Sequence, residues 1–176
     1  MKALVIGLGN PILQDDGIGI YAARTIRELL PPDHTIDVVE LAVGGLGLME
    51  AMIGYESVVL IDAIWSPEEA DLGQVVQFTA ADLQLTMNTA SAHDVDLTTA
   101  LQVGRQLGAV LPQDEAIHIV AVRARQVLDF GDRPTPIVLA ALPVVVRSVM
   151  TQLGQPDPAL ALEELIPIIG GYDDFT

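Results

Sequence analysis

The sequence predicts an α/β protein: a three-layer sandwich in which helices on both faces cover a five-stranded, mostly parallel twisted sheet with one antiparallel edge strand. Short apolar runs alternate along the chain with segments whose apolar residues recur at helical spacing. No obvious linker divides the 176 residues. We therefore expect one α/β domain over residues 1–154 and a tail over residues 155–176 that packs loosely or is disordered.

Five segments are expected to form strands. Four apolar runs predict buried strands at residues 2–8, 35–41, 57–64 and 116–124. The fifth segment, residues 73–79, alternates polar and apolar side chains. It follows the third strand too closely for a crossover helix, so it is expected to be an antiparallel edge strand.

The helical patterns fall between and after these strands. Helices are expected within residues 16–30, 44–55, 91–108 and 135–154, and residues 162–169 are expected to be the exception in an otherwise loose tail. The segment 91–108 is expected to begin as a loop and to become a helix capped near Asp94 or Asp96. Pro143 should kink or restart the helix of residues 135–154.

Composition excludes several classes of protein. The absence of cysteine excludes disulfides, thiolate zinc sites and a cysteine nucleophile. The formal net charge of −16 opposes binding to nucleic acid or anionic membrane, and favours a cationic or metal-carrying partner or simply solubility. The richest apolar run, residues 137–146, is too short to span a bilayer, and no signal peptide is evident. A cytoplasmic protein is expected.

Polar residues follow the strands where ligands bind in open parallel sheets. Asp15 and Asp16 follow the first strand, Asp62 is expected to end the third, and His93 precedes a later helix. Each has a structural interpretation, since an aspartate before a helix usually caps it and a lone loop histidine usually forms hydrogen bonds. Together, two carboxylates and an imidazole suit a divalent metal ion.

The glycine-rich stretch of residues 7–19, GLGNPILQDDGIG, does not fit a phosphate-binding loop. A dinucleotide fingerprint requires a third glycine where Ile12 stands, and a P-loop requires a lysine, which does not occur after Lys2. The acidic pair would also repel a phosphate at this helix start.

This stretch resembles the N-terminal signature of the hydrogenase maturation proteases, and the likeness extends to about residue 153. The resemblance implies that Asp16, Asp62 and His93 bind metal. It also implies that the turn in ELAVGGLGLME, with Gly44 and Gly45, contributes to substrate recognition. The family often has glutamate where Asp16 stands, so the shorter side chain could alter the reach of this group.

By the same resemblance, the protein is an endopeptidase that removes the C-terminal extension of a nickel–iron hydrogenase large-subunit precursor after nickel insertion. Nickel would arrive with the substrate, no organic cofactor is expected, and the protein is expected to be a monomer. Asp16 and Asp62 would be catalytic. Two mechanisms stay open: a bound metal could activate the carbonyl or the water with one aspartate as base, or the carboxylates could act as an acid-protease pair with metal used only for recognition.

Three alternatives stay open on the sequence alone. A non-catalytic module of the same fold would bind metal or the precursor without cleaving it. A peptidyl-tRNA hydrolase-like esterase shares a similar opening, GLGNPG, but would need a basic face for tRNA. A nucleotide-binding oxidoreductase is disfavoured by the missing phosphate motifs.

Overall fold

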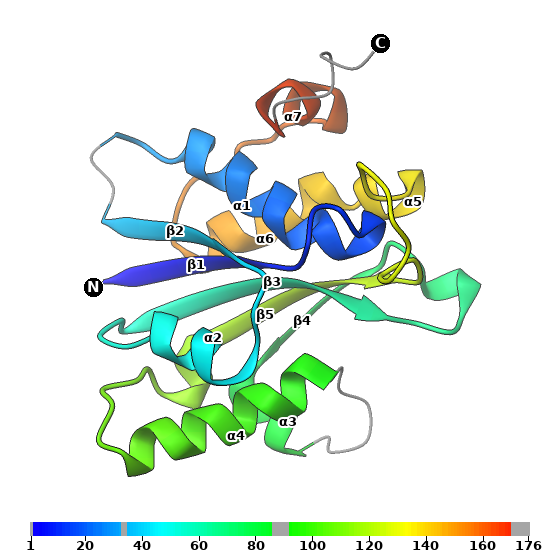
Figure 1. The fold of residues 1–176 in the computed structure, drawn as a ribbon. Helices are drawn as coiled ribbons and strands as arrows, with labels where there is room; N and C mark the ends of the chain where they lie inside the picture. The colour runs from blue at the N-terminus through cyan, green and yellow to red at the C-terminus, as the bar shows by residue number, and fades with distance from the viewer. Residues whose placement is uncertain (1, 33–34, 86–91, 170–176) are drawn as a thin grey trace.

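The computed structural model describes residues 2–32, 35–85 and 92–169; within these ranges, the side chains of residues 84, 85, 92–96 and 166–169 lie outside the description. One five-stranded sheet has the strand order β2-β1-β3-β5-β4 (Figure 1). Its strands are β1 (Ala3–Leu8), β2 (Ile36–Leu41), β3 (Ser57–Trp65), β4 (Val75–Thr79) and β5 (Ile117–Ala124). All neighbouring pairs are parallel except β4 with β5, which confirms the predicted antiparallel edge strand.

Helices cover both faces of the sheet (Figure 1). One face carries α1 (Ile18–Leu29), α5 (Pro136–Leu139), α6 (Leu142–Gln152) and α7 (Leu162–Ile169). The other carries α2 (Gly45–Ala51), α3 (Ala80–Leu85) and α4 (Ala92–Gln106). Short 3-10 turns are η1 (Gln14–Gly17), η2 (Glu69–Asp71) and η3 (Asp114–Ala116). The predicted three-layer α/β fold is confirmed.

The alternation of side chains along the buried strands builds two cores. Val59 and Ile61 of β3 pack with α1 and α6, whereas Val58 and Leu60 pack with α2 and α4. Leu165 of α7 is fully buried in the first of these cores, where α7 lies against α1. Among the described helices, none combines the length and apolar character needed to cross a membrane.

Two local predictions concern helix boundaries. The chain restarts at Leu142 after α5, so Pro143 stands in the first turn of α6, where its missing N–H breaks no helical bond; the predicted restart is confirmed. The predicted start of the helix in residues 91–108 is wrong, because α4 begins at Ala92. His93 therefore belongs to the first turn of α4 rather than to a loop, and Asp94 and Asp96 lie inside the helix.

Candidate functional site

The site region begins where β1, β2, β3 and β5 end, an edge that we call the carboxyl edge. From β1 the chain continues to β2 on one side of the sheet, whereas from β3 it continues to β4 and β5 on the other side, so β1 and β3 flank a topological switch point (Figure 1). Ligands of open α/β sheets bind in the crevice at such a point.

Two glycines seat helix α1 on this switch point. A Cβ atom at Gly19 would overlap the carbonyl oxygens of Leu8 and Ile61, and one at Gly7 would overlap the carbonyl oxygen of Gly19. The first turn of α1 therefore touches the ends of β1 and β3 with its backbone. Gly7 and Gly19 thus serve close packing of the helix on the strands. This role agrees with the sequence analysis, in which the stretch does not match a phosphate-binding motif.

The turn between β1 and η1 fixes the carboxylate of Asp16. Gly9 has a φ of 131°, in the region that favours glycine, and its N–H donates to the Leu41 carbonyl at 3.0 Å. The next N–H, of Asn10, donates to Asp16 Oδ2 at 2.6 Å. The backbone therefore orients the carboxylate of Asp16, a half-buried residue.

Asp62 lies on the other side of the switch point. It does not end β3, as predicted, because pairing with β5 continues to Trp65. It is, however, the first residue beyond the pairing with β1, which stops at Gly7 and Ile61. Its side chain is 4% exposed, and Oδ1 accepts a hydrogen bond from the Ala63 N–H at 2.8 Å.

The structure brings the elements that carry Asp16 and Asp62 together, since η1 lies against β3. His93 belongs to the first turn of α4, a helix that covers the sheet face shared by Val58, Leu60 and, by alternation, Asp62. The His93 side chain lies outside the described residues. Among the side chains that the structure does describe, no three His, Cys, Asp or Glu residues form a metal-binding group. The proposed metal set thus requires His93.

Asp15 has a different role from its neighbour, and sequence reasoning missed it. The N-cap of α1 is Gly17, without a side-chain hydrogen bond, so neither Asp15 nor Asp16 caps this helix. Asp15 is 2% exposed. Its Oδ1 accepts from the Thr135 N–H and hydroxyl, both at 2.7 Å, and its Oδ2 accepts from the Gln126 N–H at 3.1 Å. We call this arrangement the Asp15 clasp.

The segment that Asp15 holds is the loop of residues 125–135, between β5 and α5. Its Gly131 N–H donates to the Ile12 carbonyl at 3.1 Å, and the Asp132 carbonyl accepts from the Tyr21 hydroxyl at 2.9 Å. The Gln14 side chain packs where a Gly131 Cβ would stand, and Gln14 itself has a φ of 29°. The loop after β5 is thus joined to the turn after β1.

The predicted recognition glycines begin α2. Gly44 is its N-cap, and Gly45 has a φ of 57° with no atom within 4 Å of the place where a Cβ would stand. This turn follows β2, whose last residue, Leu41, accepts the hydrogen bond from Gly9. Gly44 and Gly45 therefore lie at the carboxyl edge, with open space beside Gly45; their role in recognition stays a prediction.

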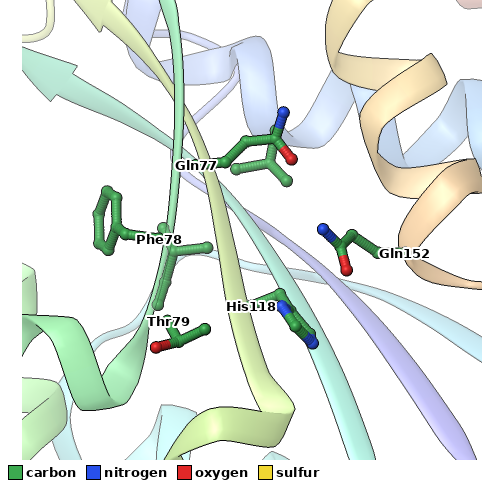
Figure 2. A pocket seen from close by; sticks show the side chains of 7 residues that line it. Gln77, Phe78, Thr79, His118 and Gln152 are labelled. Carbon is green, nitrogen blue, oxygen red and sulfur yellow. The ribbon is translucent and has the colours of Figure 1, made fainter.

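A separate pocket of about 210 Å³ lies at the opposite end of the sheet (Figure 2). His118 and Thr79 face each other in the register of β5 and β4, and Gln77 and Gln152 complete its polar lining. His118 is the second residue of β5, at the strand's amino end, so this pocket is not part of the Asp16 and Asp62 site.

Fold and site together define an α/β protein with carboxylates at the switch point of its sheet. Residues 20–152 match the family model described as hydrogenase maturation protease, so the chain belongs to this family of endopeptidases. The match excludes the opening motif of residues 7–19, so the family assignment stands independently of it. The predicted family resemblance is confirmed. The family assignment replaces the tRNA-hydrolase and oxidoreductase alternatives.

Known relatives agree with this assignment. The Hydrogenase 2 maturation protease of Escherichia coli (strain K12) is 26% identical over 129 residues, which are 68% of this chain and 78% of the relative. The [NiFe] hydrogenase maturation protease HybD from Thermococcus kodakarensis superposes with a TM-score of 0.68 at 27% identity, covering 88% of this chain and 100% of that one. The hydrogenase maturating endopeptidase HybD from E. coli shares the fold, with a TM-score of 0.72 at 24% identity and coverage of 88% and 93%.

Proposed function

We propose that this endopeptidase removes the C-terminal extension of a nickel–iron hydrogenase large-subunit precursor after nickel has been inserted. The observation that carries the proposal is the placement of Asp16 and Asp62 on two elements that meet at the switch point, in a chain of this family. The precursor is then its partner, as the names of the relatives suggest.

In this proposal nickel is part of the substrate. The donor set fits a divalent ion, because carboxylate oxygens and an imidazole nitrogen bind such metals in the absence of thiolates. Asp16 and Asp62 each accept a backbone N–H bond, which fixes the carboxylate orientation before the substrate arrives. Together with His93, they would distinguish a nickel-loaded precursor from an empty one.

The chemistry assigned to the chain is general base catalysis of peptide hydrolysis. Asp16 or Asp62 takes a proton from the attacking water, and the second carboxylate either binds the metal-loaded substrate or, in a carboxylate-pair mechanism, donates a proton to the leaving amine. Gly44 and Gly45 would admit the substrate backbone, because no side chain fills the space beside Gly45.

The test uses purified precursor in nickel-loaded and nickel-free forms, followed by intact mass. We expect loss of a C-terminal peptide from the loaded form only. Asp16→Asn, Asp62→Asn and His93→Ala should each abolish this loss, whereas Glu115→Gln, an exposed change beside the amino end of β5, should not. Cleavage of both forms would contradict the proposal that the site distinguishes nickel-loaded from nickel-free precursor. Binding without any cleavage would contradict the proposed protease activity.

A further inference from the structure

Large apolar side chains gather at the carboxyl edge with at least half of their surface exposed. We call this set the apolar rim: Ile12, Val43, Leu46, Trp65, Leu128 and Phe130, with exposed fractions of 58, 52, 55, 57, 82 and 81%. Ile12 follows β1, Val43 and Leu46 follow β2, and Trp65 is the last residue of β3. Leu128 and Phe130 belong to the loop after β5.

Topology and hydrogen bonds place the segments that carry the rim at one edge of the sheet. The strand order β2-β1-β3-β5 sets the order of the segments along the edge. Hydrogen bonds join these segments: the Gly9 N–H donates to the Leu41 carbonyl, and the Ser66 N–H donates to the Ala124 carbonyl at 2.8 Å. The Gly131 N–H donates to the Ile12 carbonyl, so the loop after β5 reaches past the end of β3 to the turn after β1. Exposed apolar patches that are built in this way mark binding surfaces in soluble proteins.

The most exposed part of the rim is also held in place. Leu128 and Phe130 lie between Gln126 and Thr135, the two residues that bond to the buried Asp15 carboxylate. Leu128 and Phe130 are therefore exposed on a loop that is held at both ends, and this part of the rim is preorganised for binding a partner.

Charge indicates what this partner is. The segments that carry the rim also carry four exposed acidic residues, Glu68, Glu69, Asp129 and Asp132. They outnumber the two arginines of these segments, Arg125, which donates to the Pro67 carbonyl, and Arg133, which pairs with Asp132. A second copy of the chain would bring another net charge of −16 to this surface and would be repelled. A segment with bulky apolar side chains flanked by basic residues is complementary to the surface.

We infer that the apolar rim is the surface on which the large-subunit precursor docks, through an apolar segment with basic flanks that leads into the Asp16 and Asp62 site. This inference rests on the proposed function for the identity of the partner. The rim segments follow the strands that flank the switch point, so a peptide bound on the rim would lie close to the Asp16 and Asp62 site. Binding energy gained at the rim would then orient the scissile bond.

The experiment compares two double variants with the wild-type protein. Leu128→Ser with Phe130→Ser removes the most exposed rim side chains. Leu107→Ser with Val110→Ser is the matched control, because these side chains are 80 and 73% exposed but lie between α4 and β5, at the other end of the sheet. Binding to immobilised nickel-loaded precursor and kcat/KM for its cleavage are measured for each, together with Tm.

We expect the rim variant to bind the precursor at least about 10-fold more weakly than wild type, with an unchanged Tm. The control variant should bind within about 2-fold of wild type. Phe130→Leu, which keeps a large apolar side chain, should keep most of the affinity. Affinity should also fall as salt rises, because of the basic flanks. Unchanged binding by the rim variant, with cleavage intact, would overturn the inference and leave the proposed function standing. If the wild type bound the precursor through the rim but did not cleave it, the inference would stand and the proposed function would be overturned. A wild-type dimer that the rim variant dissociates, with precursor binding unaltered, would assign the rim to a second copy and also overturn it.

Discussion

Replacing Asp15 with alanine removes the carboxylate that joins η1 to the β5–α5 loop. Three donors lose their acceptor at once: the N–H and hydroxyl of Thr135 and the N–H of Gln126. Asp15 is 2% exposed, so little water surrounds the carboxylate in the native protein. The change should therefore lower the free energy of unfolding well beyond the effect of an ordinary surface substitution.

The magnitude follows from the three bonds. A hydrogen bond to a charged group contributes about 1.5 to 3 kcal/mol, so even the low end would amount to about 4.5 kcal/mol. Gln126 is exposed and Thr135 half-buried, so water can replace part of this. We expect a loss of about 3 kcal/mol, or a Tm lower by about 6 to 12 °C for a chain of this size.

Urea denaturation measures this loss, and Asp129→Ala, an exposed change in the same loop, is the control with an expected effect within about 0.5 kcal/mol. Thr135→Val removes one donor of the clasp, so its effect should couple to Asp15→Ala by about 1 kcal/mol in a double-mutant cycle. An Asp15→Ala protein as stable as the control, or strictly additive effects, would refute the role assigned to the clasp.

Three further outcomes are expected. Gly19→Ala should lower the free energy of unfolding by more than about 3 kcal/mol, because its methyl group would overlap the carbonyls of Leu8 and Ile61, whereas Gly108→Ala, with a φ of 84° and open space, should cost only about 1 to 2 kcal/mol; equal losses in denaturation would contradict the packing argument. Burial raises the pKa of Glu40, but its hydrogen bonds and ion pairs with Arg24 and Arg27 outweigh burial and hold that pKa below its ordinary value of 4.5. The stabilisation of the fold by ionised Glu40 is therefore fully present above pH 4.5 and is lost as the pH falls below it. The difference in free energy of unfolding between wild type and Glu40→Gln should shrink in acid, and a difference independent of pH would contradict this. Asp62→Asn keeps an acceptor for the Ala63 N–H and should lower kcat/KM for the precursor by at least about 100-fold with little change in Tm; undiminished cleavage would remove Asp62 from the catalytic set.

The sheet could be predicted because its signals are local. The apolar runs of β1, β3 and β5 are buried on both faces, and the short connection before β4 leaves no room for a crossover helix. Pro143 marked the restart of α6 for a similar reason, since proline is compatible with only a few helix positions.

The parts that sequence reasoning placed wrongly depend on distant partners. Asp15 looked like a helix cap, but its acceptors serve donors 111 and 120 positions away, which no local pattern encodes. Asp62 looked like a strand end because it interrupts the apolar run, whereas pairing with β5 carries β3 on to Trp65. No sequence pattern gave a prediction for Leu128 and Phe130, whose exposure depends on how the loop is held by Asp15.

The Asp15 clasp also has a consequence for the order of events during synthesis. Its two halves are separated by more than 110 residues, so the nascent chain cannot close this contact until the loop after β5 has left the ribosome. Closing so long a loop is slow compared with forming helices or adjacent strand pairs. The turn that carries Asp16 is therefore fastened late, and a chain stopped before residue 126 would lack a fixed site, so incomplete copies of this protease would be inactive.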